Sequence, residues 1–334
     1  QVELRRGQVA PKQPYLNFLL YIFFFPHHQA GPIMRPHAFL ICFSEPRTFF
    51  RSRMVTGLMI FIWGLFKKVW IADMVAPMVN KEFSRFELFA GSRGNLLLMG
   101  VLYGIQIYGD FSGYSDIAVG LGRMFGYKFD RNFHQPYLAS NPSEFWKRWH
   151  ITLTNWMRDF VYLPLWNWGA GRFGTRFRPI TIMLASSMAL MLVMGLWHGA
   201  GWNFILWGGV HGALFVGWRM LPGKLAPGLL ASFAFQTMVM AAWVIFREPN
   251  LDFLAKALSR YSSWLGMDSM RAFLWLAGIM AFSRLEDLIE QRFKGMARWA
   301  CRNPLPVIGF TYGVILFLVL IGAGSATTFI YQRF

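Results

Sequence analysis

Apolar stretches of near-membrane length recur along this 334-residue chain, and no polar block long enough for a soluble domain separates them. A helix rises about 1.5 Å per residue, so crossing a bilayer takes about 20 apolar residues, and in lipid the backbone polar groups must be satisfied within helices or closed barrels. The apolar runs occupy residues 15–25, 54–78, 95–121, 180–197, 204–218, 229–246, 272–282 and 305–321. The pattern predicts an all-α polytopic membrane protein with about seven or eight membrane-embedded helices. We expect a single domain over residues 1–334.

Two segments do not fit a simple membrane span. Residues 26–37 (PHHQAGPIMRPH) are broken by prolines and a glycine, which predicts a re-entrant segment that other parts of the protein enclose. Residues 145–150 (FWKRWH) mix aromatic and basic side chains. Asn141 and Pro142 precede them as a helix N-cap and first-turn proline. This pattern, within the mixed polar and aromatic stretch 125–154, favours an interfacial amphipathic helix that dips toward the core.

Five charged residues fall inside the apolar runs, where charge is expensive: Lys67, Lys68, Asp73, Asp110 and Asp116. Lys67 and Lys68 either snorkel toward an interface or divide their run into two shorter pieces. Asp110 and Asp116 are six positions apart, about 240° around a helix, so they do not form an acid–base dyad. We expect one of them to pair with a cation such as Arg123 or Arg158.

The charge balance is basic, with 33 Lys and Arg against 16 Asp and Glu and a net charge of +17. Charged residues make up only 15% of the chain, compared with about 25% in soluble domains. The basic residues cluster between apolar runs, as in 47–53 and 172–178, which suits loops facing anionic head groups. Membrane lipids are therefore the expected partners, and nucleic acid is not.

Residues 195–212 (GLWHGAGWNFILWGGVHG) place His198 and His211 among apolar and aromatic neighbours. Burial keeps a histidine neutral and able to accept a proton. His198 is therefore a candidate general base, and the alternative is a buried histidine bonded to a neighbouring carbonyl. His211 would face another side of a continuous helix and is interpreted as a packing residue. Trp197, Trp202 and Trp207 are expected to exclude water. Asn203 is expected to supply a hydrogen bond.

His150, at the end of FWKRWH, is the second candidate. It either reaches the same cavity as His198 or is an interfacial histidine in an aromatic belt. The histidine spacing fits no metal site, and the chain has no HExxH or CxxC motif, so we expect no metal.

Four strings, in chain order, resemble the membrane-bound O-acyltransferase family, and its bacterial branch of alginate O-acetyltransferase-like and teichoic-acid D-alanylation-like proteins in particular. The strings are FFPHHQAGPIMRP at 24–36, the long segment 114–165 from YSDIAVGLG to VYLPL, MGLWHGAGWNFILWGGVHG at 194–212 and FIYQRF at 329–334. The resemblance implies helices around a funnel or tunnel. It assigns the catalytic histidine to His198 and a second functional histidine to His150, which would orient the acyl group or stabilise the oxyanion.

The resemblance also implies an O-acetyltransferase in the bacterial cytoplasmic (inner) membrane. Its donor would be acetyl-CoA or another acyl thioester, with no tightly bound cofactor. The acceptor would be an exported or cell-wall polysaccharide, reached directly or through a carrier or an extracytoplasmic acetyltransferase partner. Family members carry several membrane segments before the FFP string, so we expect this chain to lack those N-terminal segments.

Two other classes of function compete with this interpretation. A transporter or channel would line a path with broken helices and would show inverted repeats, and no internal repeat is visible. A catalytically inactive assembly subunit would follow if segments needed for activity are absent.

Overall fold

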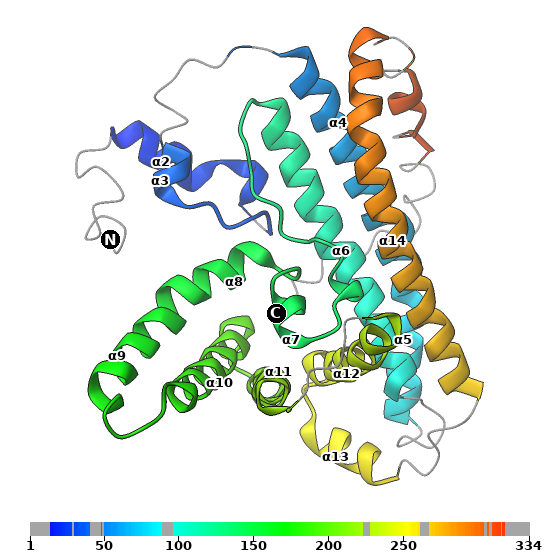
Figure 1. Cartoon of the computed structure of the whole chain (residues 1–334). Helices are drawn as coiled ribbons and strands as arrows, with labels where there is room; N and C mark the ends of the chain where they lie inside the picture. The colour runs from blue at the N-terminus through cyan, green and yellow to red at the C-terminus, as the bar shows by residue number, and fades with distance from the viewer. Residues whose placement is uncertain are drawn as a thin grey trace.

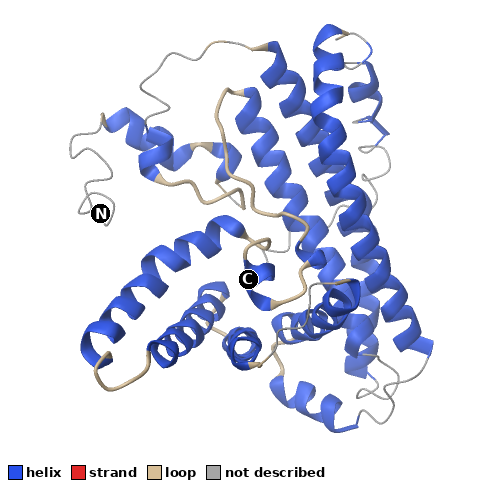
Figure 2. Ribbon diagram, in the orientation of Figure 1, coloured by secondary structure: helices blue, strands red, loops and turns tan. Residues whose placement is uncertain are grey.

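The computed structural model of the chain describes residues 14–28, 30–40, 48, 50–88, 96–222, 228–260, 267–303, 306, 309–314 and 316–317. Within these residues the chain forms helices and no strands (Figures 1 and 2), which confirms the all-α prediction for this part. The elements are α2 (Tyr15–Phe23), η1 (Phe25–His27), α3 (Pro36–Leu40), α4 (Arg51–Phe66), η3 (Lys67–Ala72), α5 (Asp73–Leu88), α6 (Leu96–Met124), η4 (Pro136–Leu138), α7 (Pro142–Trp146), α8 (Ile151–Met157), η5 (Arg158–Tyr162), α9 (Leu163–Phe173), α10 (Pro179–His198), α11 (Trp202–Met220), α12 (Leu229–Arg247), α13 (Leu251–Arg260) and α14 (Met267–Arg302).

Three described helices have the length and apolar composition to cross a membrane: Arg51–Ser84, Pro179–His198 and Leu229–Arg247. The first runs without a break through α4, the π-helical turn η3 and α5. The count of seven or eight spans stays a prediction. The FIYQRF string and residues 305, 307–308, 315 and 318–321 of the last apolar run lie outside the described residues.

Glycines bring α4 and α6 together, and α14 lies beside both helices (Figure 1). A Cβ atom added to Gly64 would lie 2.5 Å from the carbonyl oxygen of Gly113, and one added to Gly120 would lie 2.6 Å from the carbonyl oxygen of Gly57. Larger residues at these positions would therefore force the two backbones apart. Such small-residue contacts are typical of helix packing in membranes.

The lysines and aspartates inside the apolar runs pair with one another across helices. Lys67 Nζ lies 2.6 Å from Asp116 and 3.4 Å from Glu286 of α14. Lys68 Nζ lies 2.7 Å from Asp110.

Lys67 is buried, so the expectation that it snorkels is wrong. The expectation that an aspartate pairs with a cation is confirmed, but the cations are Lys67 and Lys68. Arg123 instead donates a hydrogen bond to Thr56 Oγ1. Arg158 pairs with Asp159.

The FWKRWH segment is not an interfacial amphipathic helix. Asn141 does cap α7, as expected, because its side-chain oxygen accepts a hydrogen bond from the Glu144 backbone N–H at 2.9 Å. However, α7 ends after five residues, and Phe145 and Trp149 are buried in the core. Arg148 remains at the rim, 2.6 Å from Glu144. The aromatic side chains can enter the core because this ion pair keeps the charge outside it.

Candidate active site

The turn between α10 and α11 positions His198, which is the last residue of α10. The two helices form a closely packed hairpin, because a Cβ atom added to Gly195 would meet the backbone carbonyl of Phe204, and one added to Gly208 would meet that of Met191. The His198 ring centroid then lies 5.4 Å from that of Trp207 and 5.1 Å from that of Phe246, both edge-on. Glycines thus hold the histidine against an aromatic wall.

His150 lies between α7 and α8 in a left-handed backbone conformation, with φ 42° and ψ 54°. This conformation costs a non-glycine residue roughly 1–3 kcal/mol and tends to occur at functional sites. His150 is 4% exposed. Its ring packs edge-on against Phe111 of α6, with the two ring centroids 4.7 Å apart. The strained backbone turns the imidazole into the molecule and rules out the alternative of an interfacial histidine.

Trp197 connects the two predicted site residues. Its ring centroid lies 6.2 Å from that of His150 and 5.0 Å from that of His198. Burial lowers the pKa of His150 well below its ordinary value, and the nearby His198 lowers it further. His150 is therefore neutral at pH 7. The structure brings together two histidines that are 48 positions apart in the sequence.

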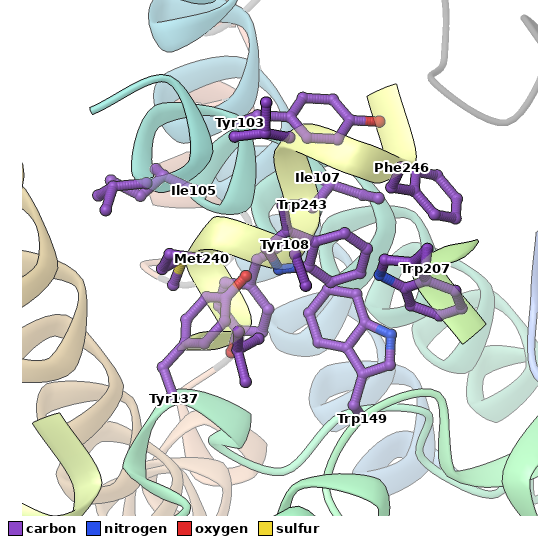
Figure 3. Packing of buried hydrophobic residues seen from close by; sticks show 14 of the residues in the cluster. Tyr103, Ile105, Ile107, Tyr108, Tyr137, Trp149, Trp207, Met240, Trp243 and Phe246 are labelled. Carbon is purple, nitrogen blue, oxygen red and sulfur yellow. The ribbon is translucent and has the colours of Figure 1, made fainter. Parts of the chain in front are cut away.

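A layer of buried aromatic side chains joins the segments that carry these histidines (Figure 3). Trp243 of α12 is its centre, with its ring centroid 5.0 Å from that of Trp149 and 5.7 Å from that of Trp207. Trp149 immediately precedes His150, and Trp207 contacts His198. Because protein interiors are densely packed, this layer fixes the two segments relative to each other.

His211 lies apart from the pair. It is fully buried. Its ring centroid lies 4.7 Å from that of Trp207 and 6.0 Å from that of Phe145, and its ring is nearly parallel to the Phe145 ring. Neither ring nitrogen makes a hydrogen bond within the part of the chain that the structure describes. The helix ends at His198 and a new helix begins at Trp202, so the two histidines do not lie on one continuous helix as the prediction from their spacing assumed. Trp207 instead separates His211 from His198.

Two expected helpers of His198 act elsewhere. Asn203 donates a hydrogen bond to the backbone carbonyl of Phe246 at 3.0 Å, which holds α11 against α12. Trp202 is 75% exposed, so it does not exclude water from His198. Both residues lie in the first turn of α11, where the hairpin directs Trp202 away from the core.

Sequence reasoning missed the hydrogen-bonded residues behind His150. Asn132 Oδ1 lies 3.3 Å from His150 Nδ1 and 2.6 Å from Thr152 Oγ1. Thr152 Oγ1 also accepts a hydrogen bond from the Ile33 backbone N–H at 2.9 Å. Ile33 belongs to the broken segment, in which Gly31 is buried, as expected of backbone that protein encloses. The only sequence signal was that these residues fall within the strings that resemble the family.

Arg35, in the same segment, was also missed. Its guanidinium group lies 2.7 Å from the Asp159 carboxylate and 4.7 Å from the centroid of the Phe160 ring. Asp159 and Phe160 belong to the π-helical turn η5, which follows α8. This contact holds the broken segment along the helix that begins next to His150. Among the described residues, no group of three or more side chains suited to metal ligation occurs.

The sequence model for the membrane-bound O-acyltransferase family (MBOAT) matches residues 6–221, which include both histidines. The chain belongs to this family. It is 37% identical over 81% of its length to a probable alginate O-acetylase of Azotobacter vinelandii. It is 34% identical over 73% of its length to a peptidoglycan O-acetyltransferase of Helicobacter pylori, and 30% identical over 64% to a teichoic acid D-alanyltransferase of Bacillus subtilis. These alignments cover 53%, 46% and 54% of the three relatives, so the chain spans about half of their length.

Proposed function

We propose that this protein is a membrane O-acetyltransferase that modifies an exported or cell-wall polysaccharide. The proposal rests on one observation: the rings of His150 and His198 both contact Trp197, in a chain of the membrane-bound O-acyltransferase family. Relatives named as alginate O-acetylase and peptidoglycan O-acetyltransferase support a polysaccharide acceptor. Family membership also favours acyl transfer over the transporter interpretation.

In the proposed reaction, His198 is the general base. It takes the proton from an acceptor hydroxyl, and the oxygen attacks the carbonyl carbon of an acyl thioester. The tetrahedral intermediate collapses with cleavage of the C–S bond, and the proton on His198 passes to the departing thiolate. General base catalysis of this kind contributes about 10²–10⁴-fold to a rate. The edge-on contacts with Trp207 and Phe246 cover part of the His198 ring and limit the access of water, which would otherwise compete as acceptor.

The donor in this proposal is acetyl-CoA or another acyl thioester that acts as a substrate, with no tightly bound cofactor. The acceptor hydroxyl belongs to the polysaccharide or to a carrier on an extracytoplasmic acetyltransferase partner. We place the protein in the bacterial inner membrane, as a multi-pass protein surrounded by lipid. The apolar helices Arg51–Ser84, α10 and α12 support this placement.

Mass spectrometry of cell-surface polysaccharide tests the proposal. Deleting the gene should remove O-acetyl groups, wild-type protein should restore them, and His198→Ala should not restore them. His28→Gln is the matched control, because this histidine is exposed. All variants must accumulate in the membrane to the same level. Wild-type acetylation by His198→Ala would exclude His198 as the base, and unchanged polysaccharide in the deletion strain would exclude the proposed function.

A further inference from the structure

The side chain of Asn132 is held at both ends behind His150. Its Oδ1 atom lies 2.6 Å from Thr152 Oγ1, 3.4 Å from the Thr152 backbone nitrogen and 3.3 Å from His150 Nδ1. Its Nδ2 atom lies 3.2 Å from Ser115 Oγ of α6. Asn132 is 1% exposed, so these neighbours determine which way its carboxamide faces.

Two backbone N–H groups fix the direction of these hydrogen bonds. A backbone N–H can only donate, so Thr152 Oγ1 must accept from Ile33 at 2.9 Å, and its own hydrogen is left for Asn132. The Thr152 backbone N–H also points to the same atom of Asn132. An NH₂ group there would face two donors, so this atom is the carboxamide oxygen.

The protonation of His150 follows from this arrangement. Its Nδ1 atom faces an acceptor oxygen, so in the neutral imidazole Nδ1 carries the hydrogen and Nε2 keeps its lone pair. We propose that Asn132 is a positioning residue that holds neutral His150 as the Nδ1–H tautomer and leaves Nε2 as a proton acceptor. The catalytic consequence of this proposal rests on the proposed function.

The surrounding backbone keeps the ring in this orientation. The Ile151 N–H donates to the Asn132 carbonyl at 2.9 Å, and the His134 N–H donates to the Arg148 carbonyl at 2.9 Å. These two bonds pair the segments on either side of the left-handed His150. The edge-on contact with Phe111 covers one side of the imidazole. A ring flip that exchanged the two nitrogens would therefore break the Asn132 contact, and no other acceptor for the His150 ring is found among the described residues.

The inferred tautomer restricts what His150 can do. A group that stabilises an oxyanion must donate a hydrogen bond to it, and the only N–H of neutral His150 is used by Asn132. His150 therefore accepts a hydrogen bond at Nε2 and orients the acceptor hydroxyl, while another donor must serve the oxyanion. This excludes oxyanion stabilisation, one of the two roles expected for His150, and directs Nε2 to the acceptor hydroxyl rather than to the acyl group.

Nitrogen NMR of the full chain in nanodiscs tests the tautomer without any need for activity. The protein is labelled with ¹⁵N-histidine, and the His150 signals are identified by their loss in His150→Gln. We expect a protonated, pyrrole-type Nδ1 and an unprotonated, pyridine-type Nε2 in the wild type and in Ser115→Ala. Asn132→Leu should give a mixture of the two tautomers. A wild-type Nε2–H tautomer, or an Asn132→Leu spectrum identical to wild type, would overturn the proposal.

Kinetics give a second measurement if Asn132→Leu does not fold. Asn132→Asp keeps the oxygen but makes it anionic, which favours the imidazolium form of His150. Using membranes supplied with labelled acetyl-CoA, we expect a loss in kcat of about tenfold at pH 7, with KM for the donor little changed and the acid limb of the pH profile moved upward. Ser115→Ala, which removes only the Nδ2 contact, is expected to stay within about threefold of wild type. An acid limb that does not move in Asn132→Asp would contradict the role of Asn132. If Asn132→Leu leaves the His150 tautomer unchanged but the enzyme transfers acetyl groups, the role of Asn132 is excluded and the proposed acetyl transfer is not.

Discussion

Lys67 forms a 2.6 Å ion pair with Asp116, and its ammonium group is almost completely buried between α4, α6 and α14. Replacing Lys67 by Met would leave the buried carboxylate of Glu286 and the 30% exposed carboxylate of Asp116 without this partner. Breaking a fully buried pair costs about 3–5 kcal/mol, and the cost is smaller here because water reaches Asp116. We therefore predict a fall in the thermal midpoint of Lys67→Met in detergent. Lys81→Met, at an exposed position, should change it little.

The double variant Lys67→Met/Asp116→Leu separates loss of the ion pair from loss of packing. It removes one of the two carboxylates together with the lysine, so it should recover part of the stability that Lys67→Met loses. A double variant less stable than Lys67→Met would show that Asp116 has another essential partner.

The ion pair between Arg35 and Asp159 gives a second prediction. Arg35→Ala and Asp159→Ala should each lower acetyl transfer by roughly tenfold, because the broken segment that carries Ile33 loses its attachment to η5. Ile33 in turn fixes Thr152 behind His150. In a double-mutant cycle the two losses should not add. Fully additive losses would mean that the two residues act independently.

The sequence predicted the class of fold and the two histidines, and both for local reasons. Apolar runs of spanning length can be counted along the chain, and the WHG and RWH strings identify His198 and His150 by resemblance. The partners of charged and polar groups were not predictable in the same way. Ile33 bonds to Thr152 across 119 positions, and this contact exists only because the broken segment lies along α8.

The misjudged FWKRWH segment shows the same limit. A helical pattern treats Lys147, Arg148 and the neighbouring aromatic side chains as one continuous surface. The chain instead turns at His150 with φ 42°, which sends Trp149 into the core. No propensity rule predicts a left-handed histidine, because tertiary contacts must offset its cost. Such outliers are found from structure and then interpreted as functional.

A third prediction concerns pH. Burial lowers the pKa of His150 well below 6.5, and His198 of α10 is the titratable group that acts on it. The unfolded chain takes up a proton near pH 6.5, whereas folded His150 takes one up only at lower pH. The free energy of unfolding is therefore unaffected by His150 above pH 6.5. It decreases as the pH falls from 6.5 toward the pKa of His150 in the folded protein.

The matching experiment follows the thermal midpoint of the protein in nanodiscs between pH 7.5 and pH 5, as approximate limits that bracket the ordinary histidine range. His150→Gln should show a shallower loss below pH 6.5 than wild type, and the exposed His28→Gln should match the wild type. Acetyl transfer should stay flat from neutral pH to below 6.5. A wild-type acid limb centred at or above 6.5 would contradict a buried, neutral His150.

The last prediction uses two glycines of α11 that differ in their surroundings. A Cβ atom at Gly208 would meet the backbone carbonyl of Met191 on α10, whereas one at Gly217 would meet nothing within 4 Å. Gly208→Ala must therefore separate the hairpin that positions His198, and we expect acetyl transfer to fall by at least about tenfold, because misplacement by 1 Å can cost 10²-fold. Gly217→Ala should keep full activity and stabilise the helix by about 0.4–1 kcal/mol. Equal activity of the two variants would show that close packing of α10 and α11 does not control the position of His198.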